Sequence, residues 1–129
     1  MIFAGRGALV LLLALAVAAC SGGPFAFSSQ QSTVMPGASP ERGRQAIQRY
    51  GCGSCHTIAG VPRAQGQVGP RLADLNERVM IAGRLANTPD NLVRWIEDPQ
   101  GVSPGTDMPN LAVTDVDARD IAAYLLMLR

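Results

Sequence analysis

The sequence predicts an all-α fold, because the stretches with a clear apolar period all show the spacing of a helix. Two of them open with a capping residue followed by proline, at Ser39-Pro40 and Thr88-Pro89. The third opens with a capping box at Thr114. No alternation of strands and helices, the mark of an α/β protein, runs through the chain. With 129 residues there is room for one small domain and the segment that precedes it.

The first helix is expected over residues 40–50 and ends where a glycine follows. One of its faces carries Gly43, Ile47 and Tyr50, which are spaced by four and three positions. A glycine costs helix stability, so we expect another element to pack closely against it. The terminal helix is the expected partner, with Gly43 against the backbone near Tyr124.

Two more helices follow in the second half of the chain. The middle one is expected from Pro89 to Glu97, ending at Pro99, within a segment that is otherwise mostly irregular. It is expected to bury Leu92, Trp95 and Ile96. The last helix is expected to run to Leu128, with an apolar stripe formed by Ile121, Tyr124, Leu125 and Leu128.

A pentapeptide, Cys52-Gly53-Ser54-Cys55-His56, follows the first helix. Two cysteines in C-x-x-C spacing followed at once by histidine are the attachment signature of a c-type haem. The thiols of Cys52 and Cys55 add to the haem vinyl groups, and the imidazole of His56 becomes an axial ligand of the iron. The sequence therefore predicts one covalently bound haem c.

Other uses of the same pentapeptide fit less well. A thioredoxin-like dithiol needs no histidine and lies in an alternating strand and helix pattern. A structural zinc site needs four ligands, and outside the pentapeptide the chain offers only Cys20 and no second histidine. A chance match is the remaining alternative.

The second axial ligand is expected to be Met108. It lies in a loop fixed by proline and glycine, Pro104-Gly105-Thr106-Asp107-Met108-Pro109, where a thioether has little freedom to leave the iron. Met1 and Met35 are expected outside the domain, Met80 in a helix-like apolar run and Met127 at the end of the last helix. A methionine is more often core filler than a ligand. Ligation by His and Met, however, raises the potential into the range of electron carriers.

The surroundings of the haem can also be proposed from the sequence. An iron-bound histidine normally donates its other N–H to a carbonyl, and the Pro70 C=O in the Gly69-Pro70 turn is a candidate acceptor for His56. Trp95 is either a plain core residue or a side chain whose indole N–H donates to a haem propionate.

Residues 1–19 read as an export signal, with Arg6 before an apolar run of about a dozen residues. The run ends in Val17-Ala18-Ala19-Cys20, which resembles the lipobox of bacterial lipoproteins and predicts cleavage before Cys20 and its lipidation. Cleavage after Ala16-Val17-Ala18 by an ordinary signal peptidase, or an uncleaved anchor, are the alternatives. Lipidation also accounts for the third cysteine, which would otherwise be a free thiol in an oxidising compartment.

Residues 20–39 are rich in Ser, Gly, Gln and Pro and are expected to form a flexible tether, so that the folded domain covers 40–129. All eleven basic residues are arginine and are balanced by ten acids, which excludes a nucleic-acid-binding footprint. Only 5% of the residues are aromatic, so a buried porphyrin would supply apolar mass that the core lacks. We therefore expect the haem-free chain to be largely unfolded.

Residues 40–129 resemble the class I c-type cytochromes. The resemblance rests on Gly43, Tyr50, the Cys52-x-x-Cys55-His56 motif, Gly69-Pro70, Trp95, Met108-Pro109 and Ala123-Tyr124-Leu125. It implies an all-α fold of three to five helices around haem c, with His56 and Met108 as axial ligands and the Pro70 carbonyl on the histidine.

A narrower resemblance is carried by residues 87–100, Pro104-Gly105 and Met108-Pro109. These are similar to the cytochrome c domain fused to subunit II of caa3-type oxidases. That likeness implies Arg78 and Trp95 as propionate partners. The sequence has no copper-binding domain and no paired transmembrane helices, so we expect a stand-alone lipoprotein relative of that haem domain.

The function favoured by the sequence is single-electron transfer rather than catalysis. We expect a monohaem carrier tethered to the periplasmic side of a bacterial membrane, passing electrons to a terminal oxidase. The alternative is an electron-accepting haem subunit of a periplasmic dehydrogenase complex. An enzyme or gas sensor would need an open iron position, and the only histidine of the chain, His56, is used as a ligand.

Overall fold

The computed structural model describes residues 35–129. The expected signal over 1–19, Cys20 and most of the expected tether lie outside the described residues. The described part contains helices α1 (Pro40–Arg49), α2 (Pro89–Glu97), α3 (Pro99–Val102) and α4 (Asp115–Leu125) and one two-stranded sheet of β1 (Met80–Ile81) and β2 (Leu85–Ala86). Short 3₁₀ helices cover Cys52–Ser54 (η1) and Leu75–Glu77 (η2). The expected all-α class is confirmed.

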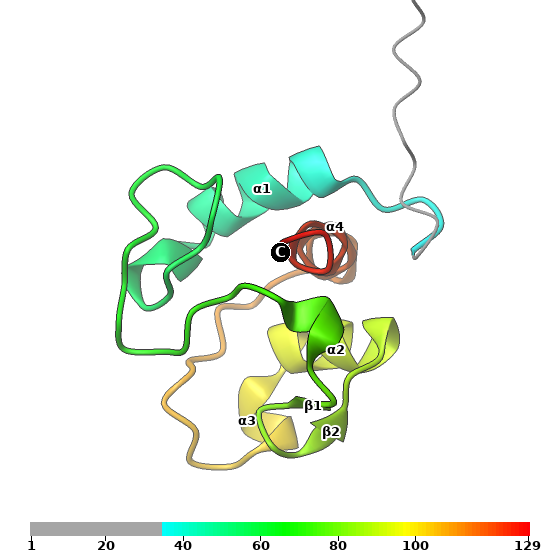
Figure 1. Cartoon of the computed structure of the whole chain (residues 1–129). Coiled ribbons are helices and arrows are strands. Elements are labelled where there is room, and N and C mark those ends of the chain that lie inside the picture. Colours follow the sequence, from blue (N-terminus) through cyan, green and yellow to red (C-terminus); the bar gives the residue numbers. More distant parts are fainter. Residues whose placement is uncertain (1–34) are drawn as a thin grey trace, which may run out of the picture.

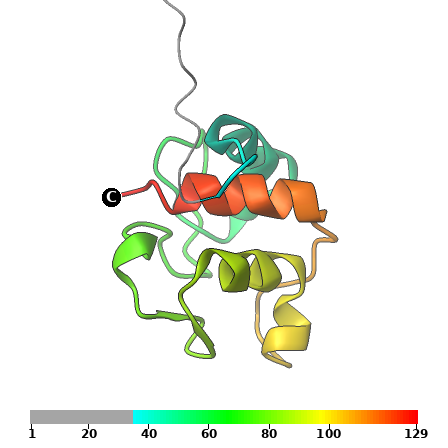
Figure 2. The same cartoon turned by 90° about the vertical axis from the view of Figure 1, so that its right-hand side faces the viewer.

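Helix α4 lies between the other two long helices. It packs against α1 on one side and against α2 on the other, while the loops between η1 and β1 wrap around one end (Figures 1 and 2). The predicted crossing of α1 and α4 at Gly43 is confirmed, but the contact lies one turn earlier on α4 than expected. A Cβ on Gly43 would collide with backbone atoms of Asp120 and Ile121, not with those near Tyr124.

Local capping explains where α1 and α2 begin. The Ser39 Oγ accepts the Arg42 N–H at 3.3 Å, and the Thr88 Oγ1 accepts the Asn91 N–H at 3.2 Å. A proline follows each cap and has no N–H to leave unpaired. The expected bounds of α2 are confirmed, and α1 ends one residue earlier than expected, at Arg49.

The last helix ends earlier than the sequence indicated. α4 stops at Leu125, not at Leu128, and Leu128 is only partly buried. Its Thr114 cap accepts the Asp117 N–H at 3.3 Å. The Asp117 carboxylate accepts from Arg49 Nη2 and from the Tyr50 hydroxyl, both at 2.8 Å, and so joins α4 to the end of α1.

Two expectations for the middle of the chain were wrong, those for Met80 and Trp95, and one short helix, α3, was not expected. Pro99 ends α2 but also opens α3, because proline suits the first position of a helix as well as it stops one. Met80 lies in strand β1, not in a helix, because Ala82 and Gly83 both have positive φ and turn the chain back into β2. Trp95 is half-buried, whereas its neighbours Leu92 and Ile96 are buried.

Packing extends upstream of Pro40. Met35, expected outside the domain, is buried with 5% of its surface exposed and belongs to the core, as does Ala38. The Ser39 N–H donates to the buried Asp120 carboxylate, which also accepts two bonds from Arg42 at 2.6 and 2.8 Å. The last residues of the expected tether, which ends at Ser39, are therefore fixed against α4.

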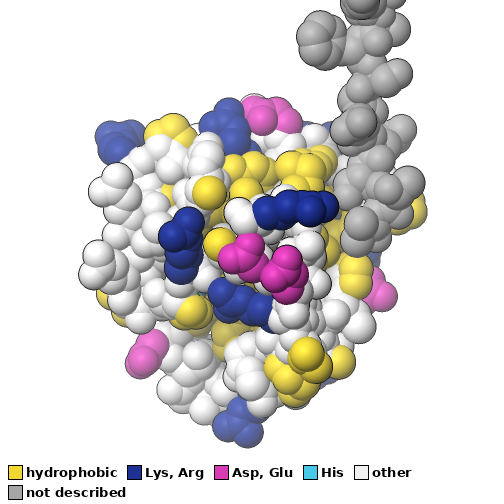
Figure 3. Space-filling view, viewed as in Figure 1, with side chains coloured by type: hydrophobic (Ala, Val, Ile, Leu, Met, Phe, Trp, Pro, Cys, Tyr) yellow, Lys and Arg dark blue, Asp and Glu magenta, His cyan; other side chains and the backbone are white. Residues whose placement is uncertain are grey.

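The surface carries mixed charge. On the face shown in Figure 3 the arginine side chains are spread out, with acidic side chains between them, rather than gathered into one basic patch. Within residues 35–129, no helix is both long enough and apolar enough to cross a membrane.

Candidate haem-binding site

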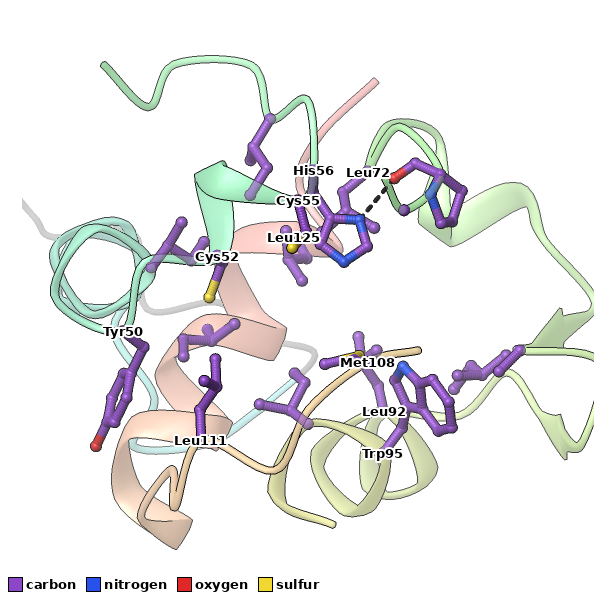
Figure 4. Close-up of a pocket in the computed structure, with 18 of the residues that line it drawn as sticks. Tyr50, Cys52, Cys55, His56, Leu72, Leu92, Trp95, Met108, Leu111 and Leu125 are labelled. Carbon is purple, nitrogen blue, oxygen red and sulfur yellow. Dashed lines mark hydrogen bonds between the residues drawn. The ribbon is translucent and has the colours of Figure 1, made fainter. Parts of the chain in front are cut away.

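A pocket of about 500 Å³ opens between the helices and the loops that wrap around them. Its walls come from helices α1, α2 and α4, from η1, η2 and strand β1, and from the loops between them. Helices α1, α2 and α4 supply mainly apolar side chains, while η1 and the loops supply the thiols, the imidazole of His56 and the thioether of Met108 together with further apolar side chains (Figure 4). The apolar lining includes Ile47, Leu72, Leu75, Leu92, Ile121 and Leu125. The volume falls within the range of about 300 to 1,000 Å³ that is usual for small-molecule and cofactor sites.

The pentapeptide lies at one edge of this pocket. Cys52 begins η1, and its carbonyl accepts the N–H groups of Cys55 at 3.3 Å and His56 at 3.0 Å. This single turn directs both sulfurs toward the pocket (Figure 4). Both cysteines are free and half-buried.

The acidity of the Cys52 thiol bears on the dithiol alternative. Burial raises the pKa of the Cys52 thiol, and the nearby Cys55 adds to the rise. Redox-active C-x-x-C pairs depend on a lowered thiol pKa. The environment of Cys52 therefore favours a packed, protonated thiol over a reactive thiolate.

His56 is held by a single strong contact. Its Nδ1 lies 2.8 Å from the Pro70 carbonyl oxygen, which can only accept, so Nδ1 carries the proton. The other ring nitrogen, Nε2, keeps a free lone pair and is directed into the pocket (Figure 4). The expected hydrogen bond to Pro70 is thus present.

Gly69 lies flat against the imidazole of His56. A Cβ at this position would come within 2.7 Å of Nδ1 and 2.9 Å of Nε2 of the ring. The Gly69 N–H also donates to the Cys55 carbonyl at 2.8 Å, which ties the Gly-Pro turn to the pentapeptide. The sequence indicated the Gly69-Pro70 turn but not this ring contact.

Met108 lies on the opposite wall. His56 comes down from one side of the pocket, and Met108 faces it from the other, with Trp95 on the same side as Met108 (Figure 4). Met80 also lines the pocket, from strand β1, and 45% of its surface is exposed. Met108 is half-buried, in the loop where the sequence placed it.

Arg78 lines the pocket but is exposed. Its Nη2 donates to the carbonyls of Arg71 at 2.9 Å and Ala73 at 3.2 Å, and its own carbonyl accepts from Asn87 Nδ2 at 2.8 Å. The guanidinium is therefore anchored at the mouth of the pocket, with further N–H groups left to donate. Trp95 lines the same pocket from α2.

Two glycines that sequence reasoning passed over shape the pentapeptide. A Cβ on Gly53 would lie 2.7 Å from both Cα and Cβ of Ala64. Gly66 donates to the Gly53 carbonyl at 3.1 Å and packs against the Ser54 carbonyl. The loop after His56 therefore lies directly on the C-x-x-C turn and supports it.

The residues present fit a c-type haem. Two free thiols at one edge, an imidazole nitrogen and a thioether on facing walls, and an apolar lining are what covalent haem c requires. Among residues 35–129, no group of three or more His, Cys, Asp and Glu side chains is arranged to hold a metal ion by itself. The donor set thus suits a haem iron better than a bare ion.

Comparison with known proteins agrees with the site. The family model for cytochrome c matches residues 40–129. Cytochrome c oxidase subunit 2 from Alkalihalophilus pseudofirmus is 38% identical over 88 residues, which cover 68% of this chain and 24% of the relative. The subunit 2 proteins of Bacillus sp. (strain PS3) and Bacillus subtilis are 34% and 29% identical over 91 and 84 residues. The chain spans about a quarter of the length of these relatives.

Proposed function

Because this chain belongs to the cytochrome c family, an electron-transfer family with covalently bound haem c, we propose that it is a monohaem electron carrier tethered to a bacterial membrane. In this proposal Cys52 and Cys55 bind the haem covalently, and His56 and Met108 are the axial ligands. The iron, when bound, supplies reversible one-electron chemistry.

One observation carries the proposal. The free Nε2 of His56 and the thioether of Met108 face each other across a single pocket that has both thiols at its edge (Figure 4). With both axial positions taken by side chains, no position remains for a substrate, so the protein would relay electrons without catalysis of its own. The Nδ1 bond to Pro70 would fix the imidazole and increase its basicity as a ligand.

Replacing Met108 tests this assignment. In Met108→Ala, expressed with a haem-attachment system, we expect covalent haem that has lost the absorption band of the Met-to-iron bond. We expect the potential to fall by on the order of 0.1 V or more, since axial ligands tune haem potentials over about 0.8 V. Redox titration and optical spectra measure both quantities.

Met80→Ala is the matched control, because Met80 lines the same pocket from an exposed strand position. Its band and potential should stay close to those of the wild type. An unchanged spectrum in Met108→Ala, or a lost band in Met80→Ala, would refute the assignment of Met108.

The relatives bear on the electron acceptor. All three are subunits of cytochrome c oxidase, which favours a terminal oxidase as the partner over the alternative of a dehydrogenase complex. Arg78 and Trp95 are the proposed partners of the haem propionates, because both line the pocket and carry N–H donors.

We further propose that Cys20 carries the lipid that holds the domain on the periplasmic side of the membrane. In Cys20→Ser we expect the holoprotein to leave the membrane fraction, because two or more acyl chains are needed for stable anchoring and none would be attached. Fractionation followed by haem staining measures the shift, with Ser21→Ala as the control that keeps the cysteine. Retention of Cys20→Ser in the membrane would point to an uncleaved leader, and a soluble wild type to ordinary cleavage.

A further inference from the structure

We propose that Gln100 is a positioning residue that holds the loop of Met108 in place, an inference that rests on Met108 being the second axial ligand. Gln100 lies on α3 and reaches over the loop with its side-chain amide. Its Nε2 donates to the carbonyls of Thr106 at 2.8 Å and Met108 at 2.9 Å. Its Oε1 accepts the Gly105 N–H at 3.2 Å. One side chain therefore binds the loop at three points.

Only a primary amide of this length satisfies the arrangement. The two carbonyls require two donors, and the Gly105 N–H requires an acceptor. These partners fix which end of the Gln100 amide is the nitrogen and which is the oxygen. Glutamate would offer no donor to the carbonyls, and leucine would offer neither donor nor acceptor.

The loop has few other bonds of its own. The Thr106 N–H donates to Ser103 at 3.1 Å, and the Met108 N–H reaches the Thr106 hydroxyl only at 3.5 Å. The backbone on either side of the Met108 side chain therefore depends on the Gln100 amide. Without it, the loop would be free to swing the thioether away from the pocket.

Gln100 is itself well anchored. The Asp98 carboxylate caps α3 by accepting the Gly101 N–H at 2.9 Å, and the Ser103 N–H donates to the Pro99 carbonyl at 2.9 Å. Asp98 also ends α2, a helix that contributes pocket-lining residues. The rigid part of the fold thus extends through α3 and the Gln100 side chain to the loop.

With haem bound, these contacts would give the Met108 thioether a low tendency to leave the iron. Any external ligand that takes the place of Met108 must first let the loop open, and opening breaks the bonds to Gln100. Removing them should leave Met108 bound in the resting protein but make it easier to displace.

The test uses oxidised holoprotein titrated with imidazole, which competes with a thioether for haem iron. In Gln100→Leu we expect the Met-to-iron band to be present without ligand and the imidazole affinity to rise about ten- to a hundredfold, the effect of losing two to three modest hydrogen bonds. The control is Gln45→Leu on α1, an exposed glutamine whose amide donates to Glu41. It should stay within about twofold of the wild type.

A merely structural role predicts a different pattern. It would lower the resistance of the whole protein to denaturant and leave the imidazole affinity under native conditions unchanged, and that result would overturn the proposal. Amide exchange adds a local readout: the Gly105 N–H should lose protection in Gln100→Leu, while the Thr106 N–H, which donates to Ser103, should change much less.

Two further arms keep the outcomes distinct. If the leucine variant does not take up haem, Gln100→Glu, which keeps the size of the side chain, replaces it in the imidazole titration. An unprotected Gly105 amide in the wild type would refute the contact to Gln100 without any variant. If Met108→Ala retains the Met-to-iron band, the axial assignment itself fails. If that band is lost but Gln100→Leu binds imidazole like the wild type, only the role of Gln100 fails.

Discussion

Without attached haem, the chain is expected to be largely unfolded. The pocket of about 500 Å³ is lined by apolar side chains from α1, α2 and α4, so emptying it leaves part of each of these three helices without a packing partner. Without haem, the apolar side chains that line this open pocket would be exposed to water, which is unfavourable. A typical domain is stable by only about 5 to 15 kcal/mol, so collapse or unfolding should replace the empty pocket.

The double variant Cys52→Ala, Cys55→Ala lacks both attachment thiols and supplies the haem-free chain, once its absorption spectrum shows that His56 and Met108 hold no haem without them. Circular dichroism should show little helix, and denaturant should produce no cooperative transition. The wild-type chain with haem attached is the control and should unfold cooperatively. A haem-free chain with near-native helix content and a sharp transition would contradict this prediction and show that the apolar walls are sufficient by themselves.

The first residues of the helices could be predicted from local signals in the sequence. Ser39 and Thr88 cap their helices through contacts within three residues, so the start of α1 and the whole of α2 follow from sequence alone. The same holds for the Pro70 carbonyl, because a bound histidine needs an acceptor and the turn that provides one is nearby in sequence.

What could not be read from the sequence depends on contacts between distant segments. The apolar run around Met80 is compatible with a helix and with a strand. Only the turn at Ala82 and Gly83, which forms in the folded chain, makes it a strand. Met35 lies in a stretch whose composition is typical of a flexible tether, yet its side chain is buried in the core. Gln100 ends the 87–100 stretch that carries the narrower resemblance, but the sequence gives no sign of its role, which depends on three backbone atoms that only the folded loop brings together.

Replacing Gly43 by alanine is expected to destabilise the protein by about 3 kcal/mol or more, although alanine is the better helix former by about 1 kcal/mol. The added Cβ would lie 2.5 Å from the Asp120 carbonyl carbon and 2.9 Å from the Ile121 nitrogen. These are backbone atoms of α4, so they cannot move aside as a flexible side chain would. The helices must separate, and the bonds from Ser39 and Arg42 to the buried Asp120 would weaken with them.

Denaturant unfolding of the holoprotein measures the effect, and Gly83→Ala separates sterics from backbone strain. Gly83 has φ +66° and nothing within 4 Å of an added Cβ, so alanine there should cost only about 1 to 2 kcal/mol through the left-handed conformation. A smaller loss at Gly43 than at Gly83 would mean that α1 and α4 do not approach as closely as described. The larger loss at Gly43 would instead identify backbone contact between the first and last helices as the feature that leaves no room for a side chain at this position.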